Sequence, residues 1–170
     1  VLARQGRLNE AEVARRKAVE LGPDRSDAQF NLGDILWNEG KLVEAEAAYR
    51  QAIAAKPNNV PAHFCLGALL ADQGKLAEGE AACHKAIALD PTYAKAYSNL
   101  SHVLLKQGRL ADAEAACRKA IELKPDLFAG YFQLGRMLAD QGKLNEAVAQ
   151  FQEAARIGDP SLQLHADAYY

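Results

Sequence analysis

The sequence predicts an all-α protein in which antiparallel helix hairpins, repeated with a 34-residue period, stack into a right-handed superhelix. Three observations support this fold class. A glycine recurs at a constant step, a proline recurs in a second column with the same step, and the intervening segments carry apolar residues at helical spacing. The two columns are Gly6, Gly40, Gly74, Gly108 and Gly142, and Pro23, Pro57, Pro91 and Pro125. We expect about nine helices and no strand.

The columns place four full repeats at 26–59, 60–93, 94–127 and 128–161 within a single domain covering 1–170. Residues 1–25 are interpreted as a partial repeat, and residues 162–170 as the start of a further helix. The run Leu70–Leu76 recurs letter for letter at Leu138–Leu144, as expected of a duplicated module. The chain has no initiator Met and opens in mid-pattern, so we expect it to be part of a longer protein.

In repeat 94–127, the first helix is expected over Lys95–Lys106. Tyr97, Leu100 and Leu104 lie three and four residues apart, which places them on one face of a helix. Gln107-Gly108 ends this helix, because glycine takes the left-handed conformation of a helix cap without a steric cost.

The second helix is expected over Leu110–Leu123, and Lys124-Pro125 ends it. Small residues recur in both helices, where they let two helix axes approach closely. They are Gly33, Gly67, Ser101 and Gly135 in the first helices, and Ala45, Gly79, Ala113 and Ala147 in the second. A hairpin this short covers only one of its apolar faces, so each hairpin must stack on the next.

These repeats resemble the tetratricopeptide repeat family. Repeat 94–127 meets the family pattern with Tyr97, Leu100, Ser101, Leu104, Ala113, Cys117 and Pro125. The sequence departs from it at Gln29 and His63, which replace a large aromatic residue, and at Cys83 and Cys117, which replace a larger ring. Leu36, Leu70, Leu104 and Leu138 stand in place of its tyrosine. The resemblance implies a protein interaction scaffold whose first helices line a concave groove for a partner's peptide segment.

Composition narrows the class of partner. The 20 basic and 22 acidic residues give a net charge of −2, so no positive footprint for nucleic acid is present. No apolar run reaches the roughly 18 residues that a membrane helix requires, and membrane insertion is not expected. The three cysteines are an odd number, which favours reduced thiols and a cytoplasmic location.

No catalytic, metal or cofactor site is predicted. His63, Cys65, Cys83 and His84 gather in repeat 60–93, but residues two apart on a helix point roughly 200° from each other and cannot share one ion. The four histidines are scattered over different units, and no clustered glycine loop is available to bind phosphate. We therefore expect that the chain is not an enzyme.

The predicted peptide-binding residues lie on the first helices, away from the packing stripe. They are Phe30, Asn31, Asp34, Trp37, Phe64, Lys95, Asn99, His102, Phe132 and Arg136. Aromatic residues at matched positions of an exposed face indicate that a ligand covers them. The alternative is that the rings fold against the neighbouring hairpin as the edge of the core. The sequence leaves both interpretations open.

Two other functions remain as alternatives. The units also resemble the repeat region that recruits substrates to O-linked N-acetylglucosamine transferases, which carries an asparagine ladder. The matching residues here are Asn31, Cys65, Asn99 and Gln133, so the ladder is half present. This resemblance implies a substrate-recruiting region of a larger glycosyltransferase-type enzyme. The second alternative is a self-assembly module, because the ends of a solenoid expose apolar faces that favour end-to-end association.

Overall fold

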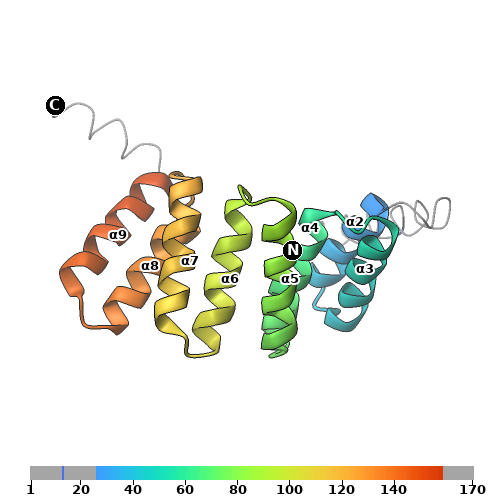
Figure 1. The fold of residues 1–170 in the computed structure, drawn as a ribbon, viewed down its shortest axis with the longest axis horizontal. Coiled ribbons are helices and arrows are strands. Elements are labelled where there is room, and N and C mark those ends of the chain that lie inside the picture. The colour runs from blue at the N-terminus through green and yellow to red at the C-terminus, as the bar shows by residue number, and fades with distance from the viewer. Residues whose placement is uncertain (1–12, 14–25, 159–170) are drawn as a thin grey trace. The chain divides into compact units, whose positions relative to one another are not determined.

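The computed structural model describes Val13 and residues 26–158, in which eight α-helices and no strand are found (Figure 1). The helices are α2 (Ser26–Asn38), α3 (Leu42–Ala55), α4 (Val60–Asp72), α5 (Leu76–Leu89), α6 (Ala94–Lys106), α7 (Leu110–Leu123), α8 (Phe128–Asp140) and α9 (Leu144–Gly158). The expected partial repeat 1–25 and the expected helix start at 162–170 lie outside the described residues, apart from Val13.

The helices pair in the predicted way. α2 packs against α3, α4 against α5, α6 against α7 and α8 against α9, so each repeat is one helix hairpin. The first helices begin at Ser26, Val60, Ala94 and Phe128, which are separated by the same step as the glycine column. In the third repeat, the expected helix ends at Lys106, Leu110 and Leu123 are those observed. The prediction of an all-α stack of helix hairpins is confirmed.

The four glycines between the paired helices adopt the left-handed conformation, with φ of 77° at Gly40, 79° at Gly74, 78° at Gly108 and 75° at Gly142. Each turn closes in the same way. At the first, Gly40 N–H donates to the Trp37 carbonyl at 2.9 Å, and Lys41 N–H donates to the Leu36 carbonyl at 2.8 Å. This pair of bonds is the Schellman motif, which satisfies the last carbonyl groups of the helix.

The chain divides into two compact units. Unit 1 covers residues 1–90 and contains α2–α5, and unit 2 covers residues 91–170 and contains α6–α9. Within unit 1, α4 packs against α3 and also contacts α2; within unit 2, α8 contacts α7 and α6 in the same way. The second hairpin of each unit is therefore stacked on the first.

A polar network joins the two hairpins of unit 1. The Asn59 side chain caps α4 by accepting a bond from Ala62 N–H at 3.0 Å, and its Nδ2 donates to Ser26 Oγ at 2.7 Å. Ser26 Oγ donates in turn to the Ala52 carbonyl at 2.8 Å. Leu127 precedes α8 at the matched position of unit 2 and has no polar side chain to make such a cap. This network was not predicted from the sequence.

The helix crossing inside each hairpin is filled differently from repeat to repeat. In the first repeat, a Cβ atom placed on Gly33 would lie 2.5 Å from the ring of Tyr49, and in the fourth, one placed on Gly135 would lie 2.8 Å from the ring of Phe151. In the second, a Cβ atom on Gly67 would lie 2.7 Å from the Cys83 sulfur and 3.1 Å from a backbone oxygen of α5. The small-residue column thus makes room for rings in two repeats and for a cysteine in the second.

Candidate functional site

The ten predicted peptide-binding residues divide equally between the two units. Unit 1 holds Phe30, Asn31, Asp34, Trp37 and Phe64, and unit 2 holds Lys95, Asn99, His102, Phe132 and Arg136. We call the surface that these residues form on the first helices the A-helix face of each unit.

On the A-helix face of unit 1, two aromatic side chains rest on a buried third. Phe30 and Trp37 are half-buried, while Tyr49 from α3 is 0% exposed. The Phe30 and Tyr49 ring centres are 6.0 Å apart and tilted, and those of Trp37 and Tyr49 are 6.3 Å apart, edge to face. These are favourable aromatic geometries. Phe30, Trp37 and Tyr49 form the repeat 1 aromatic cluster.

Tyr49 also fixes the carboxylate of Asp34. Its hydroxyl donates to Asp34 Oδ1 at 2.7 Å, a bond between the two helices of the hairpin. Burial, followed by this bond to Asp34, raises the pKa of Tyr49 above its usual range, so the hydroxyl keeps its proton and remains a donor. Asp34 therefore stands as an oriented carboxylate beside the aromatic rings.

Asn31 is exposed on α2. Phe64 on α4 is half-buried and packs against the hydrophobic core that contains Tyr49.

Sequence reasoning missed Tyr49 because it occupies the core column that Cys83 and Cys117 occupy in the next two repeats. The available signal was that this column holds a large ring in the first and fourth repeats.

On the A-helix face of unit 2, Phe132 lies in a chain of three rings. Phe128 and Phe132 are stacked, with ring centres 5.8 Å apart and planes at 13°, and Phe132 lies 5.7 Å from Phe151 of α9. Phe128 is 46% exposed and Phe132 is 43% exposed, so both present much of their surface to solvent. Phe128, Phe132 and Phe151 form the repeat 4 aromatic cluster. Phe128 was not predicted, although its place four residues before Phe132 sets it on the same helix face.

The polar predicted residues of unit 2 differ in their exposure to solvent. Lys95 and Arg136 are exposed, whereas Asn99 and His102 are half-buried. Arg136 follows Phe132 by four residues on α8, so its charge lies one helical turn from the ring. Ser98, which takes the place of a phenylalanine in the third repeat, is buried and donates to Gln133 Oε1 at 3.2 Å.

The buried cysteines have the properties of core residues. Burial raises the pKa of the Cys83 thiol to about 12 and that of the Cys117 thiol to about 11. A thiol must lose its proton to act as a nucleophile or metal ligand, so both side chains are poorly suited to either role near neutral pH. His63 Nε2 lies 3.0 Å from the carbonyl oxygen of Pro57, which is in the loop between α3 and α4.

Among residues 26–158, no three His, Cys, Asp or Glu side chains gather closely enough to hold a metal ion. The helices in this part of the chain are each too short or too polar to cross a lipid bilayer.

Three solved structures show the same fold. A crystal structure of MamA is 24% identical, with a TM-score of 0.77 over 95% of this chain and 94% of its own. PilF of Pseudomonas aeruginosa is 23% identical, with a TM-score of 0.81 over 92% of this chain and 72% of its own. YrrB, described as a TPR protein with an unusual peptide-binding site, is 21% identical, with a TM-score of 0.67 over 98% of this chain and 87% of its own.

No curated protein sequence matches this chain. Four family models, each described as tetratricopeptide repeat, match residues 1–60, 48–81, 70–134 and 133–158. Together with the hairpins, the glycine turns and the constant step between repeats, these matches show that the chain belongs to the tetratricopeptide repeat family.

Proposed function

We propose that this chain is a protein interaction scaffold whose A-helix faces hold peptide segments of partner proteins. The observation that supports this function most directly is the stacked pair Phe128 and Phe132, which stay 46% and 43% exposed beside a third ring. Large apolar groups gathered on a surface in this way are characteristic of binding sites.

The aromatic clusters are suited to anchoring a segment. An aromatic side chain has few rotatable bonds, so it loses little entropy when it is covered, and it buries a large area. In the repeat 1 cluster, the underlying Tyr49 fixes both surface rings and Asp34 before any ligand arrives. Such preorganisation lowers the cost of binding.

The charges beside the two clusters favour different ligands. Asp34 follows Phe30 by four residues, and Arg136 follows Phe132 by four residues, so each charge lies one turn from its ring. We expect the unit 1 face to prefer an apolar side chain next to a basic group, and the unit 2 face to prefer one next to a carboxylate.

The test is selection of random 16-residue peptides displayed on phage, followed by titration calorimetry with the enriched peptides. Phe128→Ala and Phe132→Ala should each weaken binding to unit 2 by about 1–3 kcal/mol, because each removes an aromatic anchor. Arg136→Glu should reverse the charge preference of the selected peptides. Val43→Ala is the control, since Val43 is 76% exposed and lies on a second helix.

A different result would reject the proposal. If Phe128→Ala and Phe132→Ala lower the melting temperature but leave the affinity of the folded protein unchanged, the rings are core residues. The interaction surface would then lie elsewhere.

Self-association is a second candidate function, favoured by the outer face of α9. Leu144 and Val148 are 64% and 54% exposed and lie on one side of this helix. Val148 stands where α3 and α7 carry Glu46 and Glu114, which bind Lys75 and Gln141 of the following hairpin. Val148→Glu should abolish association through this face, as measured by sedimentation equilibrium. An unchanged association state would exclude self-association through this face.

Recruitment of substrates for a glycosyltransferase-type enzyme stays a prediction, which the full-length protein would test.

A further inference from the structure

Unit 1 contains a pocket of about 490 Å³ bounded by α3, α4 and α5. Its apolar wall combines three branched side chains with three alanines: Ile53, Leu66, Leu70, Ala54, Ala81 and Ala82. Its polar rim consists of Arg50, His63, Glu78 and Lys85. The volume falls within the range of about 300–1,000 Å³ that is typical of ligand pockets.

The pocket is separate from the A-helix face. Leu66 lines it from α4, and Leu66 points roughly 200° away from Phe64 around that helix. The other walls come from α3 and α5, which are the second helices of the two hairpins. We call this surface the B-helix pocket of unit 1.

Unit 2 has a counterpart of about 260 Å³, lined by Arg118, Ile121, Glu122, Leu134 and Gln150. Each of these residues lies two repeats after a residue that lines the pocket of unit 1. Two replacements put longer side chains into the smaller pocket: Gln150 stands where unit 1 has Ala82, and Glu122 stands where it has Ala54. The short alanine side chains therefore open the larger pocket on the same helix framework.

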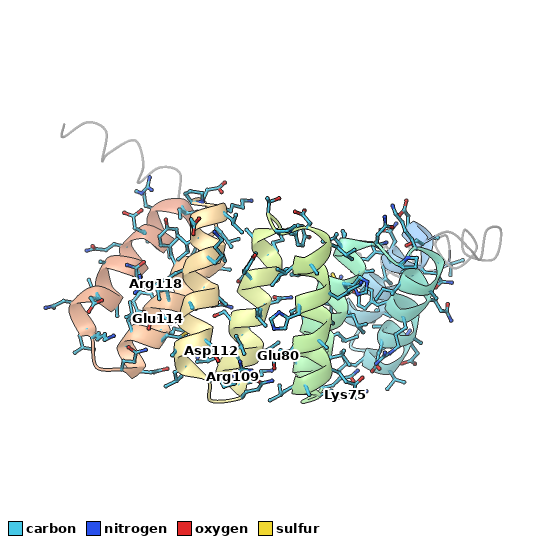
Figure 2. All side chains as sticks on the ribbon, viewed as in Figure 1. Lys75, Glu80, Arg109, Asp112, Glu114 and Arg118 are labelled. Carbon is cyan, nitrogen blue, oxygen red and sulfur yellow. The ribbon has the colours of Figure 1, made fainter. Side chains whose placement is uncertain are left out.

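The rim charges of the B-helix pocket of unit 1 are mostly neutralised within the protein. Arg50 donates to Glu46 at 3.1 Å and to Glu78 at 2.8 Å, and Lys75 Nζ binds the second oxygen of Glu46 at 2.8 Å. The bond from Lys75 is the main cause that holds the pKa of the Glu46 carboxyl below its usual value. Unit 2 has an ion pair like that of Glu46 and Arg50, because Glu114 and Arg118 pair on α7 at 2.8 Å (Figure 2).

Lys85 is the exception on this rim. It is exposed, and among the described residues it forms no ion pair. At the matched position two repeats later the chain has Glu153, which is paired with Arg156 at 2.9 Å. The pocket of unit 1 therefore combines an apolar interior with the positive charge of Lys85, which is not paired by any residue that the structure describes.

We propose that the B-helix pocket of unit 1 is a second binding site, which takes one bulky apolar side chain of a partner segment flanked by a carboxylate. The apolar side chain covers Ile53, Leu66 and Leu70, and the carboxylate pairs with Lys85. This occupant fits the charge left on the rim, and a rim ion pair of this kind contributes to selectivity as well as to affinity. A partner bound here leaves the A-helix face open for another.

The first experiment uses two fluorescent probes with the same ring system. Anilinonaphthalene sulfonate carries an anionic group, and N-phenyl-1-naphthylamine lacks it. Ala82→Gln introduces the side chain found at Gln150, and should weaken binding of both probes about tenfold because it fills the pocket. Lys85→Glu introduces the residue found at Glu153, and should weaken only the sulfonate, by about fivefold.

Matched controls separate this site from the rest of the surface. Lys119→Glu makes the same charge change one repeat further along the chain and should leave both probes unaffected. Val43→Ala, which shortens an exposed side chain of α3 outside the pocket, should not alter binding of either probe. Melting curves of every variant confirm that it is folded. Because Gln150→Ala opens the smaller pocket of unit 2, it should create a new site for the neutral probe.

The second experiment identifies the occupant. Two heptapeptides with the same Leu-Phe-Leu centre, one flanked by aspartates and one by lysines, compete with the sulfonate probe. The aspartate peptide should displace the probe from the wild type and fail to do so from Ala82→Gln. The proposal is overturned if Ala82→Gln and Lys85→Glu leave probe binding unchanged. It is also overturned if neither peptide, or only the lysine peptide, displaces the probe.

Discussion

The first and fourth repeats place a ring from the second helix at the helix crossing, whereas the second and third place a cysteine there. Tyr49 and Phe151 each touch aromatic residues on the A-helix face, and each fills the space left by a glycine of the first helix. Cys83 and Cys117 are fully buried. At the position of Phe30 and Phe132, the third repeat carries the buried Ser98.

This difference shows how one helix framework produces two kinds of repeat. A ring at the crossing is large enough to contact aromatic side chains of the A-helix face, so it can support them. A cysteine fills the crossing as a small apolar side chain and ends inside. The rings of Tyr49 and Phe151 therefore support the two aromatic clusters, and the cysteines contribute packing at their own crossings.

The largest expected effect comes from removing a supporting ring. Tyr49→Ala should lower the free energy of unfolding by about 3–5 kcal/mol, because it leaves a cavity at a fully buried position. It should also increase the exposure of Phe30 and Trp37, seen as a red shift of Trp37 fluorescence. Urea unfolding measures the loss in the free energy of unfolding. Cys83→Ala, at the matched position of the second repeat, should cause a smaller loss. Equal losses in the two variants would contradict the distinction between ring and cysteine repeats.

The stability that Cys83 and Cys117 contribute should fall at alkaline pH. The pKa values of Cys83 and Cys117 are raised in the folded protein to about 12 and about 11, above the value of about 8.5 for an unfolded thiol. Their contribution is therefore complete below pH about 8.5 and is lost as the pH rises, because the unfolded chain releases its thiol protons first.

Between pH about 8.5 and 10, the free energy of unfolding should fall on the order of 2 kcal/mol per thiol. Urea unfolding at several pH values measures this slope. The variant with both Cys83→Ala and Cys117→Ala should have a flatter profile in this window. The same slope with and without the thiols would show that other groups cause the loss.

Glycine should be required at the crossing of the second repeat. Gly67→Ala should cost about 1–3 kcal/mol in thermal or urea unfolding, because the new methyl group would lie 3.1 Å from the Gly79 carbonyl oxygen. Ser101→Ala, at the matched position of the third repeat, is the control, because a Cβ atom is already present there and only the hydroxyl is removed. If Gly67→Ala stabilises the protein, the two backbones can separate and the crossing is not tight.

The smallest expected effect concerns the link between Tyr49 and Asp34. Tyr49→Phe keeps the ring but removes the hydroxyl that donates to Asp34, so it should cost about 1 kcal/mol of unfolding free energy. Peptides selected on the unit 1 face should bind somewhat more weakly, since Asp34 is no longer held in place. A loss as large as that of Tyr49→Ala would mean that the hydrogen bond, and not the ring, supports the cluster.

The candidate site was only partly predictable. The sequence placed Phe30, Trp37 and Phe132 on the first helices, because helical spacing separates that face from the packing stripe. Their degree of exposure could not be read from spacing, since it depends on which side chain of the second helix lies beneath them. The same limit hid Phe128, whose stacking on Phe132 becomes visible only in three dimensions.

The helix hairpins and their glycine turns could be predicted from the order of the residues, as could the helix ends Lys106, Leu110 and Leu123 of the third repeat. These features depend on local preferences: a glycine that accepts a positive φ, a proline that ends a helix, and apolar residues that recur at helical spacing. Packing between helices was needed to show that Tyr49 supports the first aromatic cluster, and that Ala54 and Ala82 open a pocket that Glu122 and Gln150 narrow in the other unit. Both features depend on side chains from two or three helices meeting at one point, and the volume left between them is set by how those helices pack.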